Sequence, residues 1–311
     1  MDSSAAGNAA NLPVETPATE VAPLPRGIWG RWPGITYVLP FVVYMLVGMF
    51  EPGPPKKIDP LQPGDKSTAV LGKDGKPVGI ADEHGIRRDA DGHPIGENDE
   101  LDDDGYVQMP YRYYPRVYTI KIVATIVAML FCLPGYWIFP FRINWIAIAV
   151  GVVGAVLWIG ICKLQLEQKL LVPMGLGSLV GLGARTGFNP LAEIADQTWA
   201  YQFLAIRLLG LALIVPIIEE FFLRGFLMRF VMDVDWFKIP FGKVDRLALI
   251  TGTAFPMLLH PGELFAAFVW FSLVTWLMLR TKNIWDCVAA HAVTNGLIGA
   301  WVLWSGDWWL M

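Results

Sequence analysis

The chain has 311 residues, of which 54% are hydrophobic and 17% are charged, and its formal net charge is −4. A soluble domain carries about 25% charged residues. The apolar excess therefore predicts a membrane protein, and the lack of a basic stripe or motif argues against nucleic-acid binding. The three cysteines have neither the spacing of a disulfide framework nor that of a zinc knot.

The N-terminal third predicts three successive regions. Residues 1–33 are rich in Ala, Pro, Ser and Thr and lack the apolar core of a signal peptide, so we expect a disordered tail. Residues 34–50 predict a first transmembrane span. Residues 51–115 hold half of the acidic residues and many Gly and Pro. This composition predicts a polar, acidic extramembrane insertion made of hairpin turns or a flexible loop.

The remaining chain predicts six further spans in two regions. Residues 116–200 hold two spans and a mixed segment, 163–200, that is typical of an interfacial or partly re-entrant element. Residues 201–311 hold four spans and end in WSGDWWLM, which resembles an interfacial anchor. The fold class is therefore all-α, a polytopic bundle of about seven spans. The six later spans are expected over 117–139, 144–162, 201–227, 247–260, 263–279 and 284–305.

Basic residues in the short loops indicate the orientation. They precede the first span and lie between spans two and three, four and five, and six and seven. With seven spans these loops share one side of the membrane, which the positive-inside rule makes cytoplasmic. The acidic insertion then faces the opposite side.

The stretch VPIIEEFFLRGFLMRF, residues 215–230, places two carboxylates and an arginine in an apolar run. Ionised groups are expensive in such a setting and natural sequences use them rarely. Glu220 and Arg224 are four residues apart, a spacing that predicts an ion pair. Glu219 is rotated by about 100° from Glu220 on a helix. It is therefore free to face another group and to act as a general base for water.

Two histidines and an asparagine interrupt the later apolar runs at similar depths. At about 1.5 Å per helical residue, Glu219 lies roughly 15 Å from Arg229 and His291 lies roughly 14 Å from Lys282, the basic residues on the cytoplasmic side of their spans. His260 lies roughly 21 Å from the start of its own span. Three helices therefore bring a carboxylate and two imidazoles near the middle of a ~30 Å hydrocarbon core. Asn295 shares a helix face with His291, and the pattern predicts one shared polar site.

Three motifs in chain order resemble the signature of the CPBP family of intramembrane proteases, which includes the CAAX prenyl endopeptidases. They are Glu219-Glu220-x-x-x-Arg224, a histidine on the next span (His260), and His291-x-x-x-Asn295. Pro256 departs from the pattern, because the family has phenylalanine four residues before the second-motif histidine. The resemblance covers roughly residues 201–300, and a CAAX protease-related branch of bacterial proteins is the nearest.

The resemblance implies a multi-pass protein of the bacterial inner (cytoplasmic) membrane that hydrolyses a peptide bond of a membrane-associated protein or peptide. The catalytic set that it implies is Glu219, Glu220, His260, His291 and Asn295. Glu219 would activate water with help from His260, and His291 and Asn295 would stabilise the oxyanion. Glu220 and Arg224, a structural pair, would maintain the architecture. No cofactor is expected. A zinc alternative through Glu219, His260 and His291 stays open, and chelator sensitivity would distinguish the two.

Two other classes of function also stay open. A non-catalytic membrane scaffold or immunity-type protein would keep this fold without turnover, and the departure at Pro256 fits that possibility. A proton-coupled transporter also needs buried carboxylates and histidines, but it usually shows an internal repeat, and the spans show none. The partners expected are the lipid bilayer and a protein substrate. The sequence specifies neither the oligomeric state nor whether that substrate is prenylated.

Overall fold

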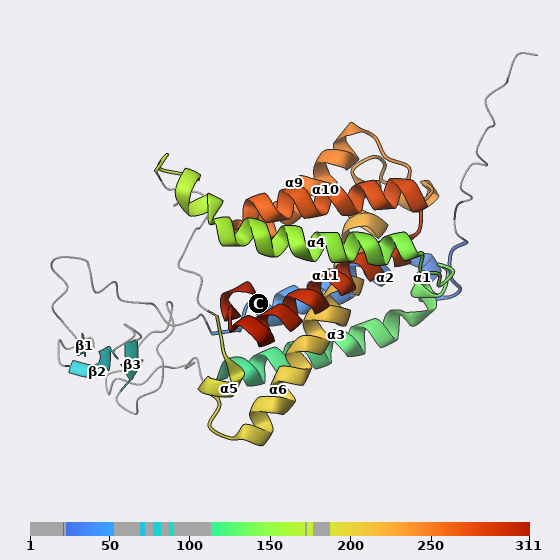
Figure 1. The fold of residues 1–311 in the computed structure, drawn as a ribbon. Coiled ribbons are helices and arrows are strands. Elements are labelled where there is room, and N and C mark those ends of the chain that lie inside the picture. The colour runs from blue at the N-terminus through green and yellow to red at the C-terminus, as the bar shows by residue number, and fades with distance from the viewer. Residues whose placement is uncertain are drawn as a thin grey trace, which may run out of the picture.

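The computed structural model describes residues 21, 23–52, 69–71, 77–81, 87–89, 113–171, 173–176 and 187–311. This part of the chain forms a bundle of apolar helices that run roughly alongside one another (Figure 1). The predicted all-α polytopic class is therefore confirmed. Most of the predicted N-terminal tail and most of the predicted acidic insertion lie outside the described residues.

The helices of the bundle follow in chain order. They are α2 (Gly34–Gly48), α3 (Tyr114–Tyr136), α4 (Trp145–Leu164) with the π-helix η2 (Glu167–Leu171), α5 (Pro190–Glu193), α6 (Gln197–Leu209), the π-helix η3 (Gly210–Ile214), α7 (Val215–Glu220), the π-helix η4 (Phe221–Leu227), α8 (Met228–Phe230), the 3₁₀ turn η5 (Trp236–Lys238), α9 (Arg246–Leu259), the 3₁₀ turn η6 (Pro261–Glu263), α10 (Leu264–Thr281), α11 (Ile284–Ser305) and the 3₁₀ turn η7 (Trp308–Leu310).

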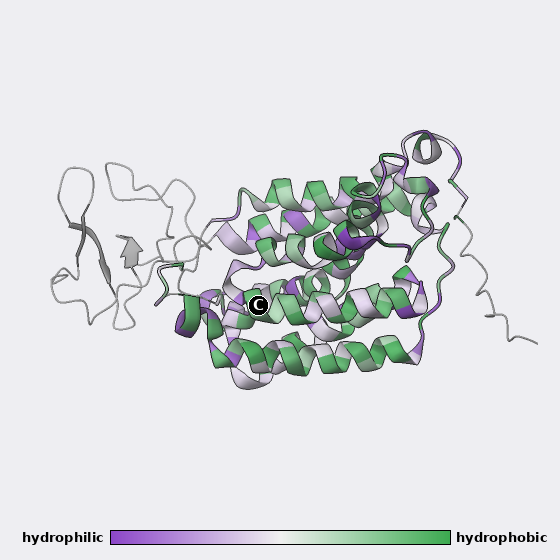
Figure 2. Cartoon of the chain, turned by 90° about the horizontal axis from the view of Figure 1, so that it is seen from above, coloured by the Kyte–Doolittle hydropathy of each residue, from purple (hydrophilic) through white to green (hydrophobic). Residues whose placement is uncertain are grey.

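Seven apolar helical segments of the described chain coincide with the predicted spans. Five are long and apolar enough to cross a membrane. The other two, α2 and α9, have 15 and 14 residues, fewer than the ~20 that cross a 30 Å core. Hydrophobic residues cover the lengths of the helices and hydrophilic ones gather at their ends (Figure 2). The protein is therefore an integral multi-pass membrane protein.

Helix α3 shows how the sequence assigns one face to the bundle and another to lipid. Tyr118, Ile122 and Thr125, spaced by three or four residues, are buried. Val123 and Val127 are 54% and 61% exposed, although both are apolar. A helix whose backbone is satisfied internally can present apolar side chains to hydrocarbon without cost.

A short helix lies within the segment predicted as a disordered tail. Helix α1 (Ile28–Arg31) packs on α3, where the Trp29 indole donates to the Phe131 carbonyl oxygen at 2.9 Å. The end of the predicted tail, from Gly27 onward, is therefore ordered against the bundle.

Three strands lie within the predicted acidic insertion. They are β1 (Ala69–Leu71), β2 (Pro77–Ala81) and β3 (Arg87–Asp89), and they form an antiparallel sheet in the order β1-β2-β3. Ile80 on the middle strand pairs with Ala69 and with Arg88. The sheet agrees with the hairpin turns predicted for this region and is a small addition to a helical protein.

Small residues on α4 allow it to pack closely along α11. A Cβ at Gly154 would lie 2.7 Å from Trp270 Nε1 and 2.9 Å from Thr294 Oγ1. The Thr294 hydroxyl donates to the Gly151 carbonyl oxygen at 2.9 Å and accepts from Trp270 Nε1 at 3.0 Å. Glycine at these positions therefore joins α4, α10 and α11 into one rigid wall.

Candidate functional site

A cavity of about 300 Å³ lies inside the bundle, and four of the predicted site residues line it. They come from three elements: Glu219 from α7, His260 from the end of α9, and His291 and Asn295 from α11. The structure therefore brings together side chains that are up to 76 residues apart in the sequence. Glu220 and Arg224 lie behind this wall and are fully buried.

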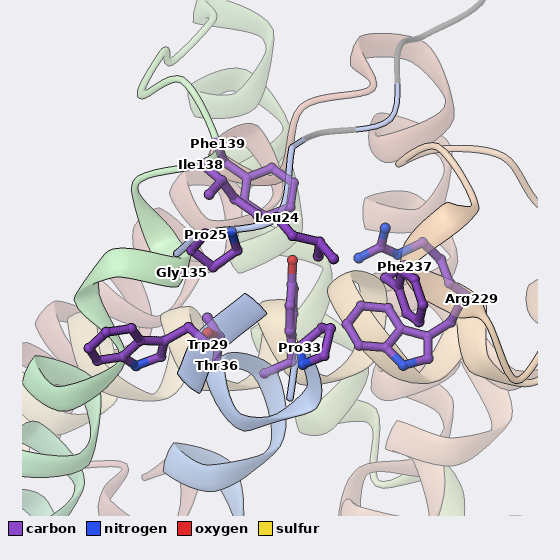
Figure 3. A pocket seen from close by; sticks show the side chains of 12 residues that line it. Leu24, Pro25, Trp29, Pro33, Thr36, Gly135, Ile138, Phe139, Arg229 and Phe237 are labelled. Atoms are coloured by element: carbon purple, nitrogen blue, oxygen red, sulfur yellow. The ribbon is translucent and has the colours of Figure 1, made fainter. Parts of the chain in front are cut away.

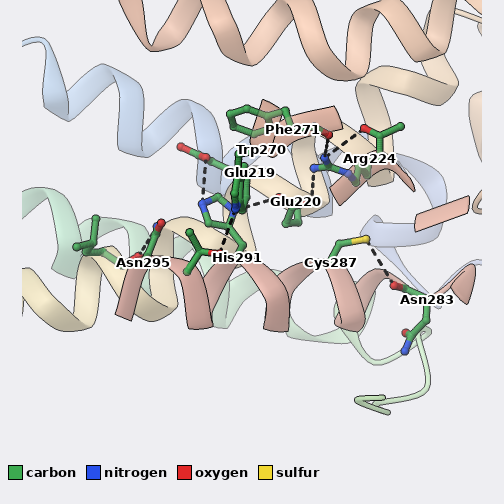
Figure 4. Close-up of polar contacts among 12 residues, drawn as sticks. Glu219, Glu220, Arg224, Trp270, Phe271, Asn283, Cys287, His291 and Asn295 are labelled. Atoms are coloured by element: carbon green, nitrogen blue, oxygen red, sulfur yellow. Dashed lines mark hydrogen bonds and ion pairs between the residues drawn. The ribbon is translucent and has the colours of Figure 1, made fainter. Parts of the chain in front are cut away.

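A buried network links the first and the third predicted motif (Figure 4). One oxygen of Glu220 accepts from Arg224, and the other lies 3.0 Å from Nδ1 of His291. Arg224 also donates to the Phe271 carbonyl oxygen at 3.2 Å and to Thr275 Oγ1 at 3.4 Å. The predicted Glu220–Arg224 pair is present. Its extension to His291 was not predicted, because that contact joins residues 71 positions apart.

Glu219 approaches the opposite nitrogen of the same imidazole. Its Oε2 lies 3.9 Å from His291 Nε2, which is too long for a direct hydrogen bond. Its side chain is 19% exposed, whereas that of Glu220 is completely buried. Two adjacent glutamates thus have different surroundings, one neutralised by arginine and the other facing the cavity.

The environment of His291 defines which nitrogen carries a proton. Nδ1 faces a carboxylate that an arginine holds ionised, so Nδ1 donates. Nε2 is left to face Glu219 and the cavity. The Trp270 ring packs on the imidazole at a centroid distance of 4.5 Å, and its own indole is fixed by Thr294. The ring of His291 is therefore held on two sides.

His260 reaches the cavity despite the unusual Pro256. Helix α9 continues through Pro256 to Leu259. The His260 backbone N–H then donates to Met257 at 3.1 Å rather than to Pro256, which leaves the Pro256 carbonyl oxygen for the His260 side chain. Nδ1 donates to that oxygen at 2.8 Å. Because a carbonyl only accepts, Nδ1 of His260 carries hydrogen, and no described residue forms a hydrogen bond with Nε2.

Asn295 satisfies a backbone oxygen that the helix itself cannot. In the π-helix η3 the Val215 N–H donates to the Gly210 oxygen, five residues earlier. The next donor in this register would be Pro216, which has no N–H. The Leu211 oxygen is thereby left over, and the Asn295 amide donates to it at 2.9 Å. This contact fixes the rotation of α11 relative to η3, and π-helical turns are frequent near functional sites.

Sequence reasoning missed several parts of the cavity wall. Tyr44, Glu263 and residues 309–311 also line it. The terminal segment, predicted as an interfacial anchor, instead folds back so that its last three residues reach the cavity. The polarity of a run of Trp, Leu and Met gave no signal for this, because such residues suit an interface and a cavity wall equally.

The donor atoms of the site do not form a metal centre in this structure. Among the described residues, no three His, Cys, Asp or Glu side chains are grouped closely enough to hold a metal ion. The zinc alternative through Glu219, His260 and His291 stays a prediction, and we route no step of the chemistry through a metal.

A second pocket lies at another part of the bundle (Figure 3). It measures about 20 Å³, room for one water molecule. Leu24, Pro25 and Trp29 from the N-terminal segment border it, together with Arg229. The guanidinium of Arg229 is satisfied by the carbonyl oxygens of Gly225 and Ile239. A pocket of this size accommodates no substrate.

The fold and the site together define a polytopic membrane protein with a buried Glu, His, Arg and Asn centre. Comparison with protein families identifies the segment that carries this centre. Residues 201–297, about a third of the chain, match the family described as type II CAAX prenyl endopeptidase Rce1-like. The resemblance inferred from the three motifs is thereby confirmed. No curated protein and no solved structure matched the chain.

Proposed function

We propose that this protein is an intramembrane endopeptidase that uses Glu219 to activate water and hydrolyses a peptide bond of a membrane-associated protein. The main supporting observation is that Glu220 lies beside Nδ1 of His291 while Glu219 faces Nε2 of the same ring, beside a cavity within the bundle. The match of residues 201–297 to a prenyl endopeptidase family supports the same class of reaction.

In the proposed reaction Glu219 accepts a proton from water while the water oxygen bonds to the carbonyl carbon of the substrate. The charge that develops on the carbonyl oxygen is stabilised by His291 Nε2–H and by the Asn295 amide. The C–N bond then breaks, and Glu219 returns the proton to the leaving nitrogen. His260, whose Nε2 is free, helps to orient the water.

Glu220 and Arg224 act in this proposal as positioning residues. To donate from Nε2, His291 must carry hydrogen on both nitrogens. The Glu220 carboxylate accepts the hydrogen on Nδ1 and fixes the plane of the ring. Arg224 keeps Glu220 ionised in a setting where an unpaired carboxylate would be expensive.

The direct test is Glu219→Gln in protein reconstituted into liposomes with a membrane-anchored reporter peptide. Glutamine keeps the shape but cannot accept the proton, so we expect cleavage to fall by about 10²–10⁴-fold. Because the described structure gives the Glu219 side chain no hydrogen bond, the melting temperature should not change. Full activity of this variant would exclude Glu219 as the base, whereas no cleavage by the wild-type protein would leave the non-catalytic scaffold interpretation in its place.

Two further experiments test whether the reaction needs a metal and whether the substrate is prenylated. Activity that survives strong chelators supports the metal-free reaction, whereas loss that added zinc restores would reassign Glu219, His260 and His291 as ligands. Reporter pairs that differ only by a prenyl group would show whether the substrate is prenylated.

The orientation and location belong to the same proposal. We place the protein in a bacterial cytoplasmic membrane with the 229–246 segment inside and residues 51–115 outside, because the basic loops share one side. Single cysteines introduced into each segment should react with an impermeant reagent in intact cells only in 51–115. Protection of that segment would invert the orientation.

A further inference from the structure

The chain turns back after the end of α11. Gly306 has φ +77°, a left-handed conformation that glycine adopts without strain, and its N–H donates to the Val302 oxygen at 2.8 Å. The chain therefore reverses and enters η7. Residues 309–311 then line the same cavity as Glu219, His260, His291 and Asn295.

Contacts from three other elements hold this returning segment. Asp307 pairs with Lys163 of α4 at 2.9 Å and accepts from the Trp301 indole at 2.9 Å. Gly187 lies directly against the backbone of Trp308. A Cβ at 187 would overlap the carbonyl group of Trp308 and the nitrogen of Trp309. The segment is therefore clamped backbone to backbone, in a position that tolerates only glycine at 187.

Arg207 of α6 holds the far end of the segment. Its Nη2 donates to the Met311 backbone oxygen at 2.8 Å, and its Nη1 donates to the Phe188 oxygen at 2.7 Å. Arg207 is only 5% exposed. Among the residues that the structure describes, it forms no ion pair with an acidic side chain. A buried guanidinium partnered by neutral carbonyl oxygens retains a strong preference for an anionic or carbonyl oxygen at the Met311 position.

We propose that Arg207, which lies behind the Met311 part of the cavity wall, belongs to a peptide-binding subsite, and that residues 309–311 occupy this subsite as an intramolecular ligand that a substrate peptide must displace. The group recognised is a peptide oxygen, either an internal carbonyl or a terminal carboxylate. The inference rests on the proposed peptidase function for its kinetic consequence only, because binding of a peptide can be measured without cleavage.

When residues 309–311 occupy the subsite, a competing peptide can bind only the molecules in which the subsite is empty. Its apparent affinity is therefore the intrinsic affinity multiplied by the fraction of such molecules. If the segment is docked in about 90% of molecules, this factor is about tenfold. Releasing the segment should therefore lower KM for a reporter peptide by up to that factor and leave kcat unchanged.

Gly187→Ala is the sharpest way to release it. The added Cβ displaces the 308–309 backbone without changing the segment or the residues around Glu219. Gly160→Ala is the matched control, because a Cβ at Gly160 meets nothing within 4 Å. We expect KM to fall several-fold for Gly187→Ala and to stay unchanged for Gly160→Ala. Should Gly187→Ala not fold, truncation after Trp308 removes the ligand directly and should have the same effect.

Binding separates this proposal from the catalytic one. A fluorescent peptide ending in Trp-Trp-Leu-Met should bind Glu219→Gln protein more tightly when Gly187→Ala is also present, measured by anisotropy. A free-acid peptide that outcompetes its amide, with the difference lost in Arg207→Gln, assigns the subsite to a terminal carboxylate. Equal binding of acid and amide that Arg207→Gln weakens assigns it to an internal carbonyl. Unchanged peptide binding in Gly187→Ala, in the truncated chain and in Arg207→Gln would overturn the proposal, whatever the proteolytic activity.

Discussion

Among the described residues, two ion pairs within the bundle have a buried cation, and they differ in their surroundings. Glu220 and Arg224 are one helical turn apart and have no exposed side-chain surface. Glu220 also contacts His291. Lys121 of α3 pairs across the chain with Glu51, at 2.6 Å, with side chains 5% and 20% exposed. The Lys121 ammonium in turn contacts aromatic rings.

The difference shows how a buried charge is used in each region. The Lys121 ammonium lies over the rings of Tyr44 and Tyr118, at 4.4 and 4.5 Å from their centroids. Both tyrosines belong to the cavity wall, so this pair supports the shape of the wall. The Glu220 pair, in contrast, acts on a titratable group. We therefore expect its loss to affect stability and chemistry together, and loss of the Lys121 pair to affect mainly stability.

The largest expected effect comes from Glu220→Gln. This change leaves Arg224 buried without a counter-ion, which typically costs about 3–5 kcal/mol. It also removes the ionised partner of His291 Nδ1, so cleavage of the reporter should be lost as well. Melting temperature in detergent and reporter cleavage should be compared with those of Glu219→Gln. Equal loss of melting temperature in the two variants would mean that the arginine holds the other glutamate.

Removing both charges should separate the two consequences. The double change Glu220→Gln with Arg224→Met leaves no unpaired charge, and replacing a buried pair by apolar groups is often neutral or better. We expect part of the lost melting temperature to return. Activity should stay absent, because His291 still lacks its carboxylate. Recovery of cleavage in the double variant would show that the pair serves stability alone.

The contrast between the pairs also explains what the sequence could predict. Glu220 and Arg224 are one helical turn apart, so their contact follows from local periodicity. The same periodicity and the apolar runs predicted the seven helices. Pairing of Lys121 with Glu51 depends on how α3 packs beside α2, which no local pattern specifies.

The finer geometry of the site depends on backbone features that the sequence pattern does not reveal. The predicted face shared by His291 and Asn295 does line the cavity, but Asn295 is anchored by a carbonyl that the π-helix η3 and Pro216 release. A change from an α-helix to a π-helix shifts each backbone hydrogen bond by one residue and has no strong sequence signal. The return of residues 309–311 depends on a glycine turn and on contacts with distant elements, so hydropathy alone suggested an anchor.

A smaller effect is expected for Lys121→Met. Glu51 keeps partial contact with solvent, so the cost should lie between the roughly 1 kcal/mol of an exposed pair and the roughly 3–5 kcal/mol of a fully buried one. Reporter kcat should remain within a few-fold of the wild-type value, because no catalytic atom is touched. Thermal melting and kinetics of Lys121→Met and of Glu51→Gln would test this. Complete loss of activity in a variant that still folds would show that this pair is coupled to the chemistry after all.

The smallest effect concerns the most exposed of the three pairs, Lys163 with Asp307, whose side chains are 44% and 24% exposed. Hydrogen bonds from Lys163 and from the Trp301 indole lower the pKa of Asp307 to about 2. Because the folded pKa lies below the unfolded value of about 3.9, the pair stabilises the fold at neutral pH and loses this contribution as pH falls from about 4 to about 2. At this exposure the contribution should be below about 1 kcal/mol. Asp307→Asn should therefore melt slightly lower than wild type at pH 7, and the two proteins should converge as pH approaches 2. A difference that persists at the lowest pH would show that the effect does not come from the charge of Asp307.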